Sequence, residues 1–474
     1  MRLMVERGSR RSPRQAPQRG HGRDRGGRRV DDQPSPGAAG ADDAGAEGGD
    51  RLDAEADATV ELAEVAARDS GTGSARERAV LVGVVRGGEP RPAVVAHLDE
   101  LAQLVDTAGG AAVARMVQER KSPDPTFFIG RGKVGELAAL LGQTGARSVV
   151  FDDDLSPSQV RHLEEGLPEG VKVLDRTAVI LDIFALRART REAQTQVELA
   201  QLSYLRSRLT RRWAHLSRQA GGIGTRGVGE TQLESDRRVI RRRIALLQER
   251  LSQIEREREV QRRRRAQLPA VAIVGYTNAG KSTLFERLTG AETLVEDRLF
   301  ATLDPRTRRA ELGDGLVVSV SDTVGFIRKL PHHLVASFRA TLAEAVLAQV
   351  VVHLVDVSHA DWEEQLAVGE EVLASLGVEP RSCIVGLNKI DRVDGASPPP
   401  PAERTAVRLS ARSGEGVDAL RAAIARAVLA QPDVAALRFP AEGGEALQKA
   451  LREEHVVARR FGSDGIELLV RRRR

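Results

Sequence analysis

A phosphate-binding loop is predicted at residues 275–282, where two glycines, a lysine and a serine have the spacing Gly-x-x-x-x-Gly-Lys-Ser. An apolar run, residues 271–274, precedes the loop, and a helix-like segment begins at Thr283, which is the strand, loop and helix order that the motif requires. Lys281 is therefore expected to hold the β- and γ-phosphates of a nucleoside triphosphate, and Ser282 to ligate Mg²⁺. The dipole of the following helix adds a favourable field for the phosphates.

A guanine-recognition segment is predicted at residues 388–391, directly after the apolar run 383–387. Asp391 can accept hydrogen bonds from the ring N–H and the 2-amino group of guanine, whereas adenine has neither donor there. A site built to form such bonds can reject the analogue that lacks them by about 10⁴-fold or more. Ser410 and Ala411 follow another strand pattern, residues 406–409, and suit a loop that presents a backbone N–H to the guanine oxygen.

Two further segments are expected to sense the nucleotide state. Residues 322–325 end an apolar run, so the Asp322 carboxylate can hold a water of Mg²⁺ and the Gly325 N–H can contact the γ-phosphate. Upstream, the Thr302 hydroxyl can reach Mg²⁺ only while the γ-phosphate is present. An isolated Thr near a Pro would be an ordinary turn residue, and the position of Thr302 between the phosphate loop and Asp322 favours the switch role.

The residue after Gly325 is Phe326, where Ras-like enzymes carry the glutamine that orients the attacking water. Phenylalanine cannot orient water, so we expect slow intrinsic hydrolysis that is accelerated by a partner, another loop or a cation. Asn278 is a candidate ligand of that cation, because translation-associated and metal-transport GTPases that use K⁺ carry Asn at this position. An asparagine that simply caps the loop explains the same residue equally well.

The predicted site can be stated as three sets of residues. The catalytic set is Lys281, Thr302 and Gly325. The set expected to bind Mg²⁺ is Ser282, Thr302 and Asp322. The set expected to bind the nucleotide is Gly275, Tyr276, Thr277, Asn278, Ala279, Gly280, Lys281, Ser282, Thr283, Phe300, Ala301, Thr302, Leu303, Asp304, Asp322, Thr323, Val324, Gly325, Asn388, Lys389, Ile390, Asp391, Ser410, Ala411 and Arg412.

These motifs, taken with segments outside the nucleotide site, resemble those of HflX-type GTPases, which belong to the same broad class as Obg and Era. The resemblance covers about residues 80–428 and includes residues 128–133, 151–157, 175–177, 183–192 and 221–234. Val228 stands where the family is expected to have Pro, and Ser235 where it is expected to have Thr. Neither departure touches the nucleotide site.

The resemblance implies a Mg²⁺-dependent GTPase that converts GTP to GDP and phosphate. It also implies association with the large ribosomal subunit and its rRNA, and dissociation or rescue of stalled ribosomes under stress. We expect the protein to act as a monomer. A nucleotide-switched RNA-binding regulator that does not split ribosomes is the alternative.

Composition agrees with a multidomain intracellular protein. The chain has 474 residues, of which 41% are hydrophobic, enough for two or three globular units. The single cysteine, Cys383, excludes disulfides within the chain and favours a reducing cytoplasm. Apolar runs fall short of the roughly 18 residues that span a bilayer, and a signal peptide's hydrophobic core is missing, so we expect a cytoplasmic protein. The pI of about 9.7 and the blocks of arginine suggest an RNA partner.

The expected fold class is multidomain α/β. Residues 1–76 are expected to be a disordered tail that is rich in Arg, Gly and Pro and then acidic, either dispensable or an arm that attracts RNA. Residues 77–188 should form an α/β domain with a small, mostly parallel sheet. Residues 269–430 should form a Ras-like G domain with a P-loop, and residues 431–474 a small α+β unit. The turn at residues 130–133 resembles a second phosphate loop but lacks the spacer and the Ser or Thr after Lys.

A long antiparallel helical hairpin is predicted for residues 189–268. One apolar stripe contains Leu199, Leu202 and Leu205, and another contains Ile240, Ile244, Leu247 and Leu251. The connecting residues 221–229 include five glycines and should form a flexible tip. The basic residues around that tip are expected to contact RNA: Arg211, Arg212, His215, Arg218 and Arg226. A solvated helix face explains residues 241–243 better.

Overall fold

The computed structural model describes residues 60–62, 76–208, 228–265, 268–290, 298–329, 344–379, 382–393, 404–431, 434–463 and 465–471. All of them belong to Ala56–Arg474, the larger of the two units into which the chain divides. The predicted hairpin tip up to residue 227, with the nearby Arg211, Arg212, His215, Arg218 and Arg226, lies outside the described residues. Within the described part, every helix is too short or too polar to cross a membrane.

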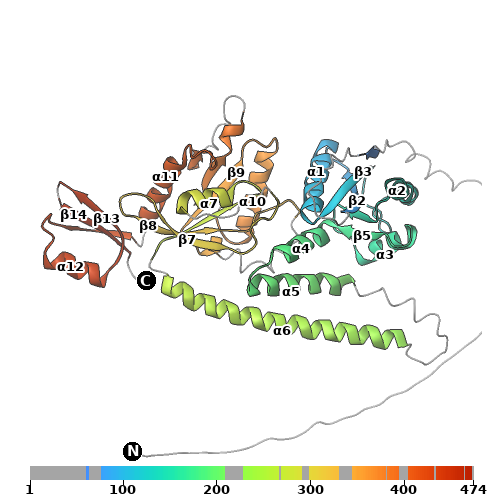
Figure 1. Ribbon diagram of the computed structural model, residues 1–474, viewed down its shortest axis with the longest axis horizontal. Coiled ribbons are helices and arrows are strands. Elements are labelled where there is room, and N and C mark those ends of the chain that lie inside the picture. The colour runs from blue at the N-terminus through green and yellow to red at the C-terminus, as the bar shows by residue number, and fades with distance from the viewer. Residues whose placement is uncertain are drawn as a thin grey trace, which may run out of the picture. The chain divides into compact units, whose positions relative to one another are not determined.

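The first α/β layer is built on a five-stranded sheet with the order β1-β3-β2-β4-β5, in which β2 to β5 are parallel (Figure 1). The central strand β2 is buried along most of its length, as expected for a parallel strand that is covered on both faces. Helices α1 and α4 cover one face, and α2 and α3 cover the other. The bounds are β2 (Glu77–Arg86), α1 (Arg91–Thr107), β3 (Gly110–Arg120), α2 (Arg131–Thr144), β4 (Ser148–Phe151), α3 (Pro157–Gly166), β5 (Lys172–Asp175) and α4 (Arg176–Arg187).

Part of the predicted tail is a strand, which corrects the expectation of disorder for those residues. Strand β1 (Val60–Leu62) pairs antiparallel with β3, with Val60 opposite Met116. The physical reason is that β3 would otherwise leave a row of unpaired backbone N–H and C=O groups at the edge of the sheet. The rest of the predicted tail before Arg76 lies outside the described residues.

Two antiparallel helices follow, α5 (Arg191–Arg208) and α6 (Val228–Arg265), and lie side by side in Figure 1. The two apolar stripes meet at a small cluster of Leu199, Ile244 and Leu247, with Leu202, Ile240 and Leu251 packed against it. The tip is shorter than predicted, because α6 already begins at Val228 and includes Gly229.

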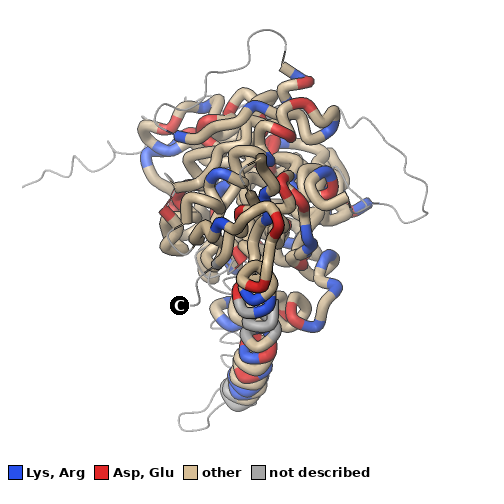
Figure 2. The backbone as a smooth tube through the Cα atoms, turned by 90° about the vertical axis from the view of Figure 1, so that its left-hand side faces the viewer, with Lys and Arg blue, Asp and Glu red and all other residues tan. Residues whose placement is uncertain are grey.

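Charges along α6 are of both signs. Figure 2 shows Lys and Arg positions alternating with Asp and Glu along this helix, at the bottom of the view. Among the described side chains, ion pairs join it to α5 at two places: Arg243 Nε lies 2.6 Å from Glu198 Oε1, and Arg258 Nε lies 2.7 Å from Glu192 Oε2. Some of the α6 arginines therefore hold the hairpin together.

The next layer is a six-stranded sheet with the order β11-β10-β9-β6-β8-β7, parallel except for the β7–β8 pair. The phosphate loop leaves β6, at the middle of the sheet, so its backbone is held by strands on both sides. The bounds are β6 (Ala270–Gly275), α7 (Lys281–Thr289), β7 (Arg306–Glu311), β8 (Val317–Asp322), β9 (Val350–Asp356), α10 (Trp362–Ser375), β10 (Ile384–Asn388), the 3₁₀ turn η3 (Ile390–Arg392), β11 (Ala406–Arg408) and α11 (Val417–Leu429).

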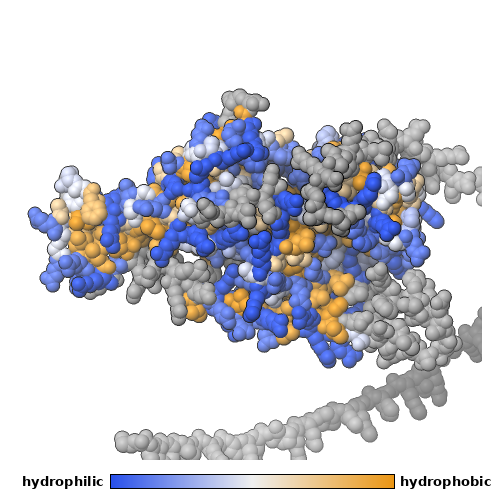
Figure 3. All heavy atoms as spheres, in the orientation of Figure 1, coloured by the Kyte–Doolittle hydropathy of each residue, from blue (hydrophilic) through white to orange (hydrophobic). Residues whose placement is uncertain are grey.

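A three-stranded antiparallel sheet and one helix end the described chain: β12 (Val434–Phe439), α12 (Gly444–Glu453), β13 (His455–Gly462) and β14 (Gly465–Arg471). Hydrophobic residues reach the surface of this part, at the left of Figure 3. Phe461 is 76% exposed, the largest exposure among the large hydrophobic residues of the described chain.

The hydrophobic core is continuous between the first α/β layer, which holds the five-stranded sheet, and the next layer, which holds the six-stranded sheet. One cluster joins α1, α4 and α5 to residues of the phosphate loop and the switch segments, among them Tyr276, Phe300 and Phe326. A second cluster joins the far face of the six-stranded sheet to β13 and β14 through Val457 and Leu469. The predicted mixed α/β class, with a parallel-sheet P-loop domain flanked by N-terminal and C-terminal elements, is confirmed.

Candidate nucleotide-binding site

The phosphate loop has the backbone conformation that its sequence predicts. Gly280 has φ +93°, and a Cβ on it would lie 2.4 Å from Asn388 Nδ2. Asn278 also adopts the left-handed region, with φ +61°, which asparagine tolerates better than most residues. Lys281 then opens α7, so the loop N–H groups and the positive end of the helix dipole face the same space.

Lys281 is buried, and its Nζ donates to the carbonyl of Tyr276 at 2.7 Å. Burial lowers the pKa of Lys281 to about 8, and the attraction of Asp322 opposes that shift only in part. A bound phosphate would supply the missing negative charge and favour the protonated ammonium. The lysine is thus prepared for an anion that lies in front of it.

The three residues predicted to bind Mg²⁺ come together. Ser282 Oγ lies 2.9 Å from Thr302 Oγ1, and the two hydroxyls donate to Asp322 Oδ2 at 2.8 and 3.1 Å. Oxygens that are neighbouring ligands of Mg²⁺, with bonds of about 2.1 Å, lie about 3 Å apart. Asp322 Oδ1 is buried and has no hydrogen-bond partner among the described residues. The donor set therefore fits Mg²⁺, with Asp322 Oδ1 available to a metal-bound water.

Asn388 connects the two ends of the site. Its Nδ2 donates to the carbonyl of Ala279 in the phosphate loop at 2.7 Å, and its Oδ1 accepts from the Ala411 N–H at 2.8 Å. The side chain is buried, so both bonds are shielded from water. Lys389 has φ +66° and pairs with Asp356 at 2.6 Å. Asp391 lies on η3, which follows Lys389 directly, and lines the cavity described next.

A cavity of about 320 Å³ lies between these loops. This volume is within the ordinary range of small-molecule sites. Its walls are formed by Thr277, Asn278, Gly280, Lys281, Ser282, Thr283, Arg298, Phe300, Ala301, Thr302, Thr323, Gly325, Asn388, Lys389, Asp391, Arg392, Ala411 and Arg412. Two basic residues in this wall, Arg298 and Arg392, were not in the predicted set, since neither stands in a motif.

The remaining predicted residues lie behind the wall or face elsewhere. Gly275, Ala279, Asp322, Val324, Ile390 and Ser410 support the wall, Tyr276 faces the first α/β layer, and Leu303 and Asp304 turn toward α4 and α5. Ser410 is fully buried, and its Oγ accepts from the Ser413 N–H at 3.1 Å. Its contribution is therefore to the shape of the loop.

Phe326 does not enter the cavity. Its side chain is 1% exposed and meets the His353 ring edge-on, with ring centroids 6.3 Å apart. Its N–H donates to Gly275 and its carbonyl accepts from Thr277, at 3.0 and 2.7 Å. The segment after Gly325 is therefore bound to the phosphate loop by its backbone, and its phenylalanine belongs to the core.

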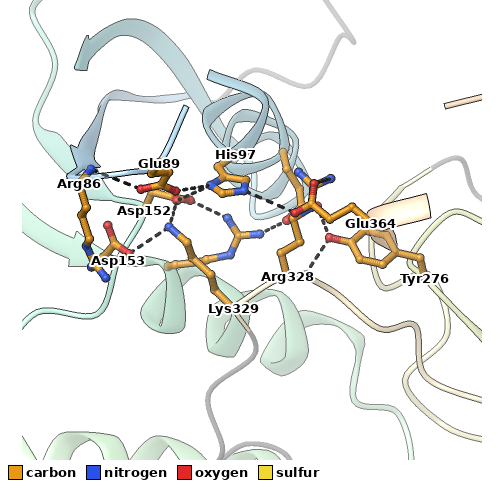
Figure 4. A network of polar contacts seen from close by, with 11 residues as sticks. Arg86, Glu89, His97, Asp152, Asp153, Tyr276, Arg328, Lys329 and Glu364 are labelled. Atoms are coloured by element: carbon orange, nitrogen blue, oxygen red, sulfur yellow. Dashed lines mark hydrogen bonds and ion pairs between the residues drawn. The ribbon is translucent and has the colours of Figure 1, made fainter. Parts of the chain in front are cut away.

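A polar network that the sequence did not predict joins the nucleotide site to the first α/β layer (Figure 4). Tyr276 of the phosphate loop donates to Glu100 of α1 and accepts from the Arg328 N–H at 2.8 Å. Lys329 Nζ donates to Asp152 and Asp153 at 2.5 and 2.9 Å. Both the phosphate loop and the segment that follows Gly325 are thus connected to the neighbouring layer.

Buried charge at the centre of this network comes from Asp152 and Arg176. Arg176 Nη1 donates to Asp152 Oδ1 at 2.6 Å, and both side chains are almost fully buried. Burial raises the pKa of Asp152, which the positive charge of Lys329 opposes. The acidic run 152–154 and the Asp-Arg-Thr segment 175–177 were visible in the sequence. The contact of Asp152 and Asp153 with Lys329, more than 170 positions away, was not.

Comparison with protein families matches three consecutive segments. Residues 95–185 match the model described as GTP-binding GTPase N-terminal, and residues 187–265 match GTP-binding GTPase Middle Region. Residues 270–389 match the model described as 50S ribosome-binding GTPase.

Curated proteins named GTPase HflX are similar over most of their length. The one from Lacrimispora saccharolytica is 49% identical over 347 residues, covering 73% of this chain and 81% of the relative. The one from Escherichia coli is 45% identical over 353 residues, covering 73% and 82%. A solved GTP-binding protein from Sulfolobus solfataricus in complex with GDP is 24% identical to this chain, and the match covers 74% of this chain and 98% of that protein, with a TM-score of 0.38.

Proposed function

We propose that this chain, which belongs to the HflX family of GTPases, binds the large ribosomal subunit in the cytoplasm and dissociates or rescues stalled ribosomes under stress. Its GTPase activity follows from that membership. Ribosome binding is supported by the match of residues 270–389 to the model described as 50S ribosome-binding GTPase. The splitting or rescue step follows from the family resemblance and is the part that needs an experiment.

The reaction is attack of water on the γ-phosphate of GTP, which yields GDP and phosphate. We assign to Lys281 the neutralisation of charge on the β- and γ-phosphates, since its ammonium lies in the wall of the cavity. The Gly325 N–H would donate to a γ-phosphate oxygen, and a Cβ at that position would come within 3.0 Å of Lys281 Nζ. The closeness of that approach explains the glycine.

Mg²⁺ would be held by Ser282 and Thr302, with Asp322 holding a metal-bound water, and would supply positive charge at the phosphate oxygens. Asp322 also fixes the orientation of both hydroxyls through its accepted hydrogen bonds. With Phe326 in the core, the described chain offers no glutamine at the usual water-orienting position. We therefore assign the acceleration of hydrolysis to the ribosome or to K⁺ near Asn278, which lines the cavity.

Sedimentation of ribosomes tests this function. Purified ribosomes incubated with the protein and a non-hydrolysable GTP analogue should separate into subunits, and GDP should not support that separation. Large subunits should also raise the GTPase rate. Binding to the large subunit without separation would support the RNA-binding regulator instead, and absence of binding would refute the ribosomal function.

Two pairs of charge reversals locate the contact. Arg218→Glu with Arg226→Glu, at the glycine-rich tip that the sequence predicts, should weaken binding to the large subunit while GTP binding survives. Arg241→Glu with Arg242→Glu is the matched control, because these two residues are exposed on a regular face of α6. Equal losses in the two pairs would mean that binding depends on overall charge and not on the tip.

A further inference from the structure

The segment that carries Thr302 is held from outside the nucleotide-binding domain. Phe300 packs edge-on against Phe184 of α4, with ring centroids 4.8 Å apart. Leu299, Phe300 and Leu303 are all buried in the cluster that contains α4 and α5. Thr302 itself turns the other way, toward Ser282 and Asp322. The residues on both sides of Thr302 are thus fixed on α4 and α5, while its hydroxyl belongs to the predicted metal site.

Asp304 makes the most specific of these contacts. Its Oδ2 accepts from the backbone N–H groups of Arg189 and Thr190 at 3.0 and 3.2 Å, and its Oδ1 accepts from the Thr190 hydroxyl. Thr190 is also the N-cap of α5, because its Oγ1 accepts from the Ala193 N–H at 3.2 Å. The carboxylate therefore lies at the positive end of α5, where a negative charge is favourable.

The contact extends to the second helix of the hairpin. Glu192, in the first turn of α5, pairs with Arg258 of α6 at 2.7 Å. The base of the hairpin is therefore connected through Thr190 to Asp304, two residues from Thr302. A displacement of the hairpin would be transmitted to the Thr302 hydroxyl over this short distance.

We propose that Asp304 is a positioning residue for GTP hydrolysis, which holds Thr302 at the predicted metal site by accepting hydrogen bonds from Arg189 and Thr190 directly before α5, so that the hairpin and the nucleotide site control each other. The proposal depends on GTP hydrolysis and does not require ribosome binding. Nucleotide exchange at the site should alter the first turn of α5, and by thermodynamic linkage a partner that holds the hairpin should alter the affinity for GTP.

Substitutions on both sides of the contact test the proposal. Asp304→Asn and Thr190→Val should each lower kcat for GTP about tenfold, the effect of losing one charge-assisted hydrogen bond. The affinity for GDP should stay within about twofold of the original protein, since Thr302 is needed only with the γ-phosphate present. Thr190→Ser keeps the hydroxyl and should restore kcat. Asp418→Asn is the control, because Asp418 is an exposed carboxylate in the first turn of α11.

Hydrogen exchange supplies a readout that does not depend on activity. In the original protein and in Thr190→Ser, peptides within residues 191–200 should exchange more slowly with a non-hydrolysable GTP analogue than with GDP. This difference should disappear in Asp304→Asn and Thr190→Val. If the difference persists in those variants or is absent from the original protein, the proposal is wrong. A parallel loss of GDP affinity, or no recovery in Thr190→Ser, would assign the contact to folding alone and would equally overturn it.

Discussion

Replacing Asn388 by alanine should separate the two ends of the nucleotide site. The substitution removes the donor to Ala279 and the acceptor of Ala411, the bonds of 2.7 and 2.8 Å that join the phosphate loop to the guanine-side loop. The Ala279 carbonyl and the Ala411 N–H are buried backbone groups, and each would lose its hydrogen-bond partner. The expected result is a lower affinity for GDP and GTP alike, because the loops contact the parts that the two nucleotides share.

The magnitude follows from the two bonds. A buried group left without a partner costs about 1–3 kcal/mol. The truncated side chain leaves space next to an open cavity, so water can reach the exposed groups, and about 1 kcal/mol per bond is appropriate. A total of about 2 kcal/mol corresponds to an increase of about 30-fold in the dissociation constant.

Isothermal titration calorimetry with GDP measures this change directly. Thr144→Val is a matched control, because it removes a buried hydrogen bond of 2.7 Å from Thr144 to Leu140, within α2 and away from the nucleotide site. The control should lower thermal stability and leave GDP affinity unchanged. A dissociation constant for Asn388→Ala within threefold of the original would show that the connection between the loops does not contribute to binding.

Three further outcomes are expected. Asp391→Asn should lower GTP affinity by about 100-fold or more and improve xanthosine triphosphate binding, because the new amide donates where the carboxylate accepted; unchanged GTP affinity in competition assays would contradict the base assignment. The rate of GTP hydrolysis should be higher in K⁺ than in Na⁺, and Asn278→Asp should reduce that difference. Equal rates in the two salts would show that K⁺ does not act at this site. The pKa of Lys281 in the folded protein, about 8, lies below its ordinary value of 10.5. Between pH 8 and pH 10.5, the unfolded chain therefore keeps the Lys281 proton that the folded, nucleotide-free protein has lost. The free energy of unfolding should consequently rise with pH over this range. A bound phosphate favours the protonated lysine, so GDP affinity should fall by up to about tenfold per pH unit above pH 8. Calorimetric titrations in buffers of different ionisation enthalpy should show proton uptake on binding. A GDP affinity that does not change with pH would refute the lowered pKa of Lys281.

The grouping of the candidate nucleotide-site residues could be predicted from the sequence because each part of the site is local. The loop at residues 275–282, the carboxylate of Asp322 and the segment 388–391 each follow a strand, and the carboxyl ends of parallel strands meet at one edge of a sheet. Ser282, Thr302 and Asp322 could thus be grouped without knowing any distance. Their hydroxyl and carboxylate oxygens lie 2.8 to 3.1 Å apart in the structure.

Contacts between the layers depended on the tertiary structure. The pairing of Tyr276 with Glu100, of Lys329 with Asp152, and of Asp304 with Thr190 joins residues more than 100 positions apart. Polar residues of these types are compatible with an exposed surface anywhere in the chain. Only the packing of the first α/β layer and the hairpin against the phosphate loop and the switch segments brings these side chains together. Some of them, such as Tyr276 and Asp152, are buried and need partners, whereas Thr190 is exposed.

The sequence by itself determined the local chemistry, since the backbone conformation of a glycine-rich loop and the hydrogen-bonding groups of a short motif depend on neighbouring residues. It also determined the apolar stripes of α5 and α6, because a helical period is a local property. Tertiary structure decided that Phe326 turns into the core, that Asp304 binds the backbone just before α5, and that Val60–Leu62 completes a sheet edge. Each of these depends on which surfaces meet across the fold, and that is set by the packing of distant segments and not by the order of residues along the chain.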